Sequence, residues 1–145
     1  MTTPSTINDE ALACAAAVLT GKDYGLRAVL DGLATPTYVT DDDGLVIYAN
    51  DACAAFAGRV PAPGQDRWCV THRLYTDDGV FLPHEECPMA VAIRSRTPIR
   101  GVSAVAERPD GSRVAFTPLP TPIFGRQGKL LGAVNMLIPR GVAPG

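Results

Sequence analysis

The sequence has few of the residues that mark several large classes of protein. Its 145 residues include only four cysteines and two histidines, and 13 lysines and arginines stand against 15 aspartates and glutamates. Four cysteines are too few for a disulfide scaffold at this length, and the lack of a basic excess argues against nucleic acid as the main partner. No apolar run reaches the roughly 18 residues that span a bilayer, so no membrane segment is expected.

The chain does have enough apolar residues for one folded domain. It is 46% hydrophobic and 19% charged, whereas intrinsically disordered chains are poor in apolar residues and rich in charge. The alanine-rich run Ala11–Leu19 follows two acidic residues, Asp9 and Glu10, where a signal peptide would have basic ones. We therefore expect a soluble cytoplasmic domain with reduced thiols.

Two helices are predicted before residue 36. Asn8 is a good N-cap and Gly21 a good terminator, so the first helix spans residues 8–20. The second begins at Asp23, and its apolar residues recur on one helical face at Leu26, Val29, Leu30 and Leu33. A single sheet face has room for one such stripe, so the other stripe predicts a homodimer formed through these helices.

The remaining residues are typical of an α+β domain. Asp-Gly turns join short β-branched runs into hairpins, and Asn50 and Gly58 bracket a short helix. Strands are predicted over Thr37–Thr40, Leu45–Ala49, Trp68–Tyr75, Val80–Leu82, Gly101–Glu107, Arg113–Phe124 and Leu130–Ile138. Helices are predicted over Asp51–Ala57 and His84–Ser95. Alternation along the elements predicts core positions at Leu33, Val39, Ile47, Val105, Val134 and Leu137.

The penultimate strand carries three prolines at alternate positions, Pro118, Pro120 and Pro122. Proline has no N–H group, so a strand containing them would hydrogen-bond on one flank only. An irregular bend is the alternative. The sequence leaves both open.

The order of these motifs resembles the PAS domain family. Residues Val29–Leu33, Thr37–Gly44 and Ile47–Asn50 are similar to the opening of that domain, with its first hairpin, acidic-Gly turn and Asn-capped helix. Gly128–Met136 resembles the last strand, and residues 68–90 resemble a PAS subgroup common in bacterial sensor histidine kinases. The resemblance covers residues 26–139, which leaves 1–25 as an N-terminal helical extension and 140–145 as a flexible tail.

This resemblance implies a five-stranded antiparallel sheet in the order 2-1-5-4-3, with helices covering one face. Such domains are non-enzymatic sensors that bind a small ligand, a cofactor or a protein partner and pass a signal to an effector. The sequence contains no recognisable kinase, cyclase or DNA-binding module. We therefore expect the signal to act in trans, for example on a histidine kinase, or within a larger sensor, and the sequence names no cofactor.

A ligand site in such a domain would be lined by large side chains with a few polar groups among them. The residues expected there are Phe56, Trp68, Tyr75, Met89, Ile93, Asn135 and Met136. Trp68 and Asn135 would supply the polar groups. The alternative is that these side chains fill the core, since methionine is a common gap-filler.

Four potential metal ligands occur as two pairs of equal spacing, at Cys69, His72, His84 and Cys87. Tetrahedral zinc accepts this spacing. We expect the four not to converge, because a strand over Trp68–Tyr75 would send Cys69 and His72 to opposite faces. The alternative function is a metal- or haem-loaded redox or gas sensor that uses His84 and the set Cys69, His72 and Cys87. His84 would be the axial haem ligand, and Leu82, Met89, Ile93 and Met136 would form the walls of the haem pocket. The flavin photosensor signature Asn-Cys-Arg-Phe-Leu is absent.

Overall fold

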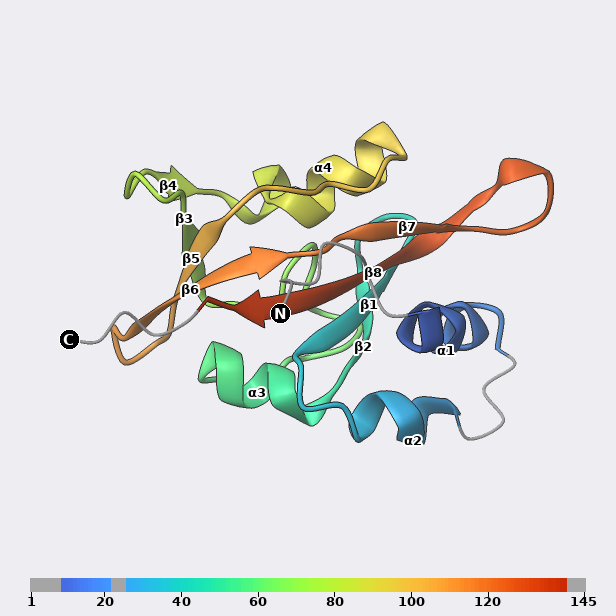
Figure 1. Cartoon of the computed structure of the whole chain (residues 1–145), viewed down its shortest axis with the longest axis horizontal. Coiled ribbons are helices and arrows are strands. Elements are labelled where there is room, and N and C mark those ends of the chain that lie inside the picture. The colour runs from blue at the N-terminus through green and yellow to red at the C-terminus, as the bar shows by residue number, and fades with distance from the viewer. Residues whose placement is uncertain (1–8, 22–25, 141–145) are drawn as a thin grey trace, which may run out of the picture.

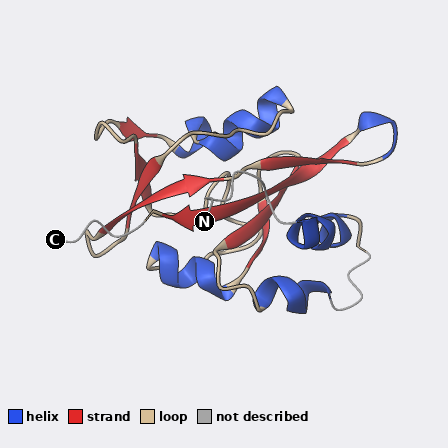
Figure 2. Cartoon of the chain, in the orientation of Figure 1, coloured by secondary structure: helices blue, strands red, loops and turns tan. Residues whose placement is uncertain are grey.

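The computed structural model describes residues 9–21 and 26–140. Helices α1 (Asp9–Leu19) and α2 (Leu26–Asp31) precede a hairpin of β1 (Thr37–Asp41) and β2 (Val46–Ala49), as the sequence predicts (Figures 1 and 2). The later elements are α3 (Asp51–Ala57), β3 (Arg73–Tyr75), β4 (Phe81–Leu82), η1 (His84–Glu86), α4 (Pro88–Ser95), β5 (Ala104–Glu107), β6 (Arg113–Pro118), β7 (Thr121–Phe124), η2 (Arg126–Gly128) and β8 (Leu130–Pro139). No helix in the described ranges is long and apolar enough to cross a membrane.

The strands form one antiparallel sheet in the order β2-β1-β8-β6-β5-β3-β4, and β7 also pairs with β8. This confirms the α+β class and the predicted order 2-1-5-4-3, in which β8 is the fifth strand, β6 and β7 are the fourth and β5 is the third. The predicted number of five strands is incomplete. The β3–β4 hairpin extends the sheet beyond β5, and the fourth strand is divided in two.

The division of the fourth strand follows from its prolines. β6 ends at Pro118, β7 begins at Thr121, and Pro120 lies between them. The carbonyl oxygen of Pro120 accepts a hydrogen bond from the Arg100 guanidinium at 3.0 Å. Among the described strands β7 pairs with β8 alone. Both of the open alternatives therefore hold in part, a bend at Pro120 and a strand bonded on one flank.

The sheet is buried on both faces because successive strand residues point to opposite sides. Tyr38 and Leu137 belong to a cluster with α3 and α4, whereas Val39 and Val134 belong to a second cluster with α1 and α2. We call these the first and the second cluster. Figure 1 shows α4 and α1 on either side of β8. Helices α3 and α4, which lie between the second and third strands of that order, cover one face as predicted, and the N-terminal helices α1 and α2 cover the other face.

Both N-terminal apolar stripes are used within the chain. Ala15 and Val18 of α1 and Leu30 of α2 are buried together in the second cluster, against Val134 of β8. The alanines of α1 leave room for α2 beside it on the same face. The argument that one stripe lacks a place on the sheet was therefore wrong. Asn8, Asp23 and the side chain of Leu26 lie outside what the structure describes.

Three of the six predicted core residues are fully buried, namely Val39, Val134 and Leu137. The other three are only half-buried, namely Leu33, Ile47 and Val105. In β2 and β5 the fully buried positions are their neighbours Val46, Tyr48, Ala104 and Ala106. The alternation of side chains did not identify which residues of these strands are fully buried, because both faces of β2 carry apolar residues.

Two predicted elements are shorter than expected. The strand over Trp68–Tyr75 is reduced to β3, since Trp68 has a positive φ of 69° that a strand does not accept. The helix over His84–Ser95 is interrupted at Cys87, which is extended at φ −69° and ψ 162°. The residue before a proline is biased toward this conformation, and Pro88 follows. Its ring then starts α4 at a position where no N–H group is needed.

Asn50 connects three segments that are separate in sequence. Its Oδ1 accepts from the backbone N–H groups of Thr37 at 3.0 Å and Cys53 at 3.3 Å, so it caps α3 as the sequence predicts and also holds the start of β1. Its Nδ2 donates to the carbonyl oxygens of Leu30 and Thr35, both at 3.0 Å. The side chain is buried, so water cannot replace these bonds.

We predict that Asn50→Ala lowers the free energy of unfolding by about 3 kcal/mol or more, above the ~1 kcal/mol typical of a lost N-cap, because buried backbone groups lose their partners. Asn50→Asp is the matched variant. It keeps the acceptor toward α3 but directs a carboxylate at the carbonyls of Leu30 and Thr35. Urea unfolding should place both variants well below the wild type, and a fully stable Asn50→Asp would contradict this account.

Candidate functional site

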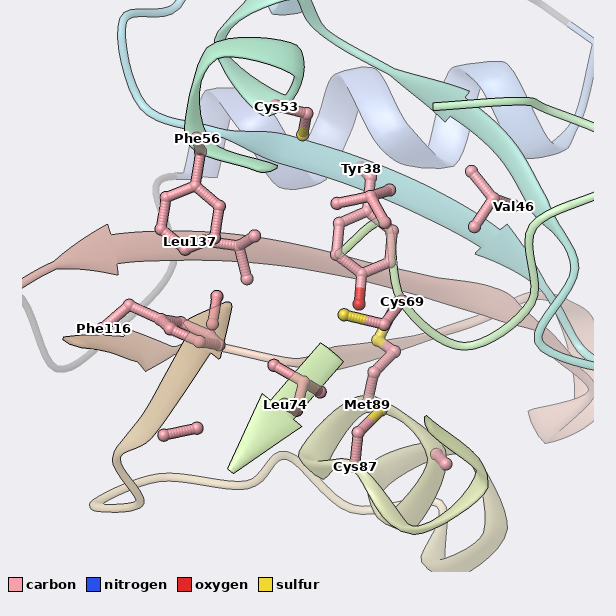
Figure 3. Packing of buried hydrophobic residues seen from close by; sticks show 14 of the residues in the cluster. Tyr38, Val46, Cys53, Phe56, Cys69, Leu74, Cys87, Met89, Phe116 and Leu137 are labelled. Carbon is pink, nitrogen blue, oxygen red and sulfur yellow. The ribbon is translucent and has the colours of Figure 1, made fainter. Parts of the chain in front are cut away.

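A small set of polar atoms lies inside the first cluster, between the sheet and α3 and α4. We call Tyr38, Cys69, Asn135 and the backbone carbonyl of Trp68 the polar centre. Tyr38 Oη donates to the carbonyl oxygen of Trp68 at 2.7 Å and accepts from Asn135 Nδ2 at 3.1 Å. In Figure 3 the Tyr38 hydroxyl points toward Cys69 and Met89.

The strand register brings the two side chains of this pair together. Tyr38 in β1 lies directly opposite Asn135 in β8, so both point to the same face of the sheet. Asn135 Oδ1 also accepts from the backbone N–H of Leu119 at 3.0 Å, in the bend between β6 and β7. The amide of Asn135 is thereby fixed in orientation and presents its N–H group to Tyr38.

Burial keeps the centre uncharged. It raises the pKa of Tyr38 well above its ordinary value and also raises the pKa of Cys69. It raises the pKa of the neighbouring thiols Cys53 and Cys87 from 9.0 to about 12. The centre is therefore a set of neutral hydrogen-bonding groups at physiological pH.

Trp68 reaches the centre through an unusual backbone turn. Its φ is 69°, and the N–H of Cys69 donates to the carbonyl oxygen of Arg67 at 2.8 Å, which makes Trp68 the central residue of a γ-turn with positive φ. The indole ring packs on Gly44, where an added Cβ would lie 2.1 Å from the ring. The guanidinium of Arg94, from α4, lies 5.3 Å from the ring centroid on the indole.

The structure brings together five of the seven residues expected at a ligand site. Phe56, Trp68, Met89, Ile93 and Asn135 lie in or against the first cluster or the polar centre. Met136 follows Asn135 in β8 and so packs in the second cluster, on the opposite face. Tyr75 lies next to Leu74 in β3 and faces outward, with the Arg113 guanidinium 4.3 Å from its ring centroid.

Tyr38 was missed as a site residue. A tyrosine in a short β-branched run is typical of the ordinary core of a strand. Its pairing with Asn135 depends on contact between residues 97 positions apart. The one available signal is that a buried tyrosine needs a partner for its hydroxyl group.

The two cysteines and two histidines with metal-like spacing lie in different surroundings. Cys69 and Cys87 are buried in the first cluster, His72 is exposed, and His84 is half-buried with its Nε2 3.4 Å from Thr71 Oγ1. Over residues 9–21 and 26–140, no three His, Cys, Asp or Glu side chains are grouped as a metal ion would need.

The residues expected around a haem do not surround one cavity. His84 lines a surface groove of about 420 Å³ with His72, Arg73, Phe81, Pro83 and Glu85. Met89 and Ile93 lie in the first cluster, and Met136 lies across the sheet. Burial also lowers the pKa of His84 below its ordinary value.

Neither a family model nor a curated protein matches the sequence, but solved structures are similar to this chain. The PAS domain of a protein from Colwellia psychrerythraea is 19% identical with a TM-score of 0.57, over 81% of this chain and 96% of that one. The PAS domain of the fruit-fly ELK potassium channel is 12% identical with a TM-score of 0.60, over 80% and 94%. The LOV domain of the blue-light activated histidine kinase of Erythrobacter litoralis EL346 is 20% identical with a TM-score of 0.53, over 75% and 98%. At these identities the likeness concerns the fold.

We predict that the thiols of the folded chain react slowly with Ellman's reagent at pH 8, because all four cysteines are buried and the pKa values of Cys53, Cys69 and Cys87 are raised. The urea-unfolded chain is the control and should react at once. The pKa values of these thiols are higher in the folded chain than in the unfolded chain, so burial of the neutral thiols contributes to the free energy of unfolding. This contribution is complete below pH ~8 and is lost as the pH rises from ~9 toward ~12. A thiol that reacts in the folded chain as fast as in the unfolded one would contradict the buried placement.

Proposed function

We propose that this chain, which has the fold of PAS domains, is a sensory domain that binds a small uncharged molecule at the polar centre. The structural change on binding is then passed to a partner protein. The observation that carries the proposal is the paired phenol and amide of Tyr38 and Asn135 inside an apolar cluster. Solved structures of this fold include the LOV domain of a blue-light activated histidine kinase, which supports a signalling role.

The polar centre favours ligand binding over simple packing. Each buried side-chain nitrogen and oxygen of the described residues has a hydrogen-bond partner, so Tyr38 and Asn135 keep a fixed donor and acceptor inside an apolar cluster, where phenylalanine and leucine would supply none. Ligand sites typically combine an apolar wall with a few placed polar groups. Phe56, Met89 and Ile93 belong to the same apolar cluster as Tyr38.

A signal from the centre has a short path to the N-terminal helices. Tyr38 and Asn135 lie on β1 and β8, and the next residue of each strand, Val39 and Met136, packs on the opposite face in the second cluster. A shift of these strands on binding would therefore change the contacts under α1 and α2. We propose this face as the output that an effector reads, in trans or within a larger sensor.

The same proposal includes no catalysis by the domain itself and a cytoplasmic location. The Cys69 thiol hydrogen-bonds the hydroxyl of Thr71 at 3.2 Å, and that hydroxyl separates the thiol from His84 Nε2, which lies 3.4 Å beyond it, whereas a cysteine nucleophile needs a base adjacent to it. The raised pKa of Cys69 fits a neutral hydrogen-bonding role.

To test the function, the purified chain is incubated with a cell extract, re-isolated, and analysed for retained small molecules by mass spectrometry. We expect one retained compound, bound about tenfold more weakly by Tyr38→Phe, which removes one hydroxyl group from the centre. Tyr48→Phe is the matched control, because Tyr48 hydrogen-bonds Asp31 in the second cluster. If the wild type retains nothing, or Tyr38→Phe retains as much, the proposal is wrong.

Homodimerisation through residues 8–33 stays a prediction, although α1 and α2 bury apolar residues within the chain. A dimer would have to use the outer faces of these helices. Light scattering across a range of concentrations tests it, and a chain that stays monomeric at high concentration contradicts it.

A further inference from the structure

We infer that the backbone carbonyl of Trp68 occupies the acceptor position of the ligand site, and that the site takes a small neutral molecule whose carbonyl or amide oxygen replaces it. The inference rests on the proposed function and names its ligand class. It follows from where Trp68 lies, what holds it there and which groups it satisfies.

The backbone of Trp68 adopts a conformation that a large side chain rarely accepts. A φ of 69° is common for glycine and unfavourable for an aromatic residue. The turn around it, closed by the Cys69 N–H on the Arg67 carbonyl, is a rare and strained type. Such strain persists only where the surroundings enforce it, and it concentrates at functional sites.

The contacts that enforce the turn come from the polar centre and Cys87 on one side and from Gly44 and Arg94 on the other. The carbonyl oxygen of Trp68 accepts from Tyr38 Oη at 2.7 Å and lies 3.8 Å from the Cys87 sulfur, which donates to it. Its N–H donates to the Gly44 carbonyl oxygen at 2.7 Å, and its ring is held between Gly44 and Arg94. The hydrogen bond from Tyr38 is the contact that a competing oxygen would take.

The composition of the centre defines what can compete. Tyr38 Oη–H offers a donor, and no charged side chain is among the buried residues of the described ranges. A charged ligand would therefore lack a compensating partner. The walls beside Tyr38 include Met89, whose flexible thioether adapts to an added group. A neutral oxygen acceptor on a small apolar body satisfies each of these conditions.

Displacement of the carbonyl would let the turn relax and move the indole off Gly44 and Arg94. Trp68 is the only tryptophan of the 145 residues. Its indole N–H signal in NMR spectra and its fluorescence therefore report on this residue alone.

The first experiment uses cyclohexanone and methylenecyclohexane as probes, two molecules of the same shape of which one carries a carbonyl oxygen. Each is added at the same concentration to the ¹⁵N-labelled full chain. We expect cyclohexanone to shift the Trp68 indole signal in the wild type and about tenfold more weakly in Tyr38→Phe. Equal shifts from both probes, or no shift from cyclohexanone, overturn the inference.

The second experiment needs no probe. In Tyr38→Phe the carbonyl of Trp68 loses its strongest donor. The fluorescence of the Trp68 indole should therefore move to longer wavelength, and the indole should become more accessible to acrylamide. Tyr48→Phe should leave the emission unchanged, and circular dichroism confirms that both variants are folded. A folded Tyr38→Phe with unchanged emission overturns the inference.

The two proposals fail separately. If a compound from the extract binds without moving the indole signal, the ligand site stands and the replacement of Trp68 is wrong. If cyclohexanone shifts the indole signal but the chain retains no compound from extracts, the turn behaves as inferred and the proposal of a sensory function is wrong.

Discussion

The hydrogen bonds of Asn50 are the constraint on which the arrangement of the domain depends. One buried amide joins the end of α2, the start of β1 and the start of α3. The start of β1, which Asn50 holds, leads into the strand that pairs with β8, and in the register of that pair Tyr38 lies opposite Asn135.

The two-faced sheet places two apolar clusters on opposite sides of the same strands. Strand residues alternate between the first and second clusters, so each strand residue of the polar centre has a neighbour under α1 or α2. Closely packed interiors transmit small displacements, because they have few voids to absorb them. The N-terminal helices α1 and α2 are therefore packed into the second cluster and share its contacts with the sheet.

Trp68 concentrates several roles in one residue. Its carbonyl completes the polar centre, its ring closes over the β1–β2 turn at Gly44, and Arg94 ties it to α4. A bulky residue at positive φ is a local conflict between backbone preference and tertiary contacts, and natural proteins keep such conflicts mainly where function needs them.

Local chemistry in the sequence was enough for the hairpin, the Asn50 cap and the order of elements, because Asp-Gly turns, capping residues and apolar runs act within a few residues of one another. The sequence shows the metal-like spacing of the four residues between Cys69 and Cys87. It does not show where their side chains lie, because their surroundings come from distant segments. The tertiary structure alone decided that β3 and β4 extend the sheet, that both N-terminal stripes share one face, and that Met136 and Tyr75 point away from the site. Only strand register could select Tyr38 as the partner of Asn135, since that pairing joins residues 97 positions apart.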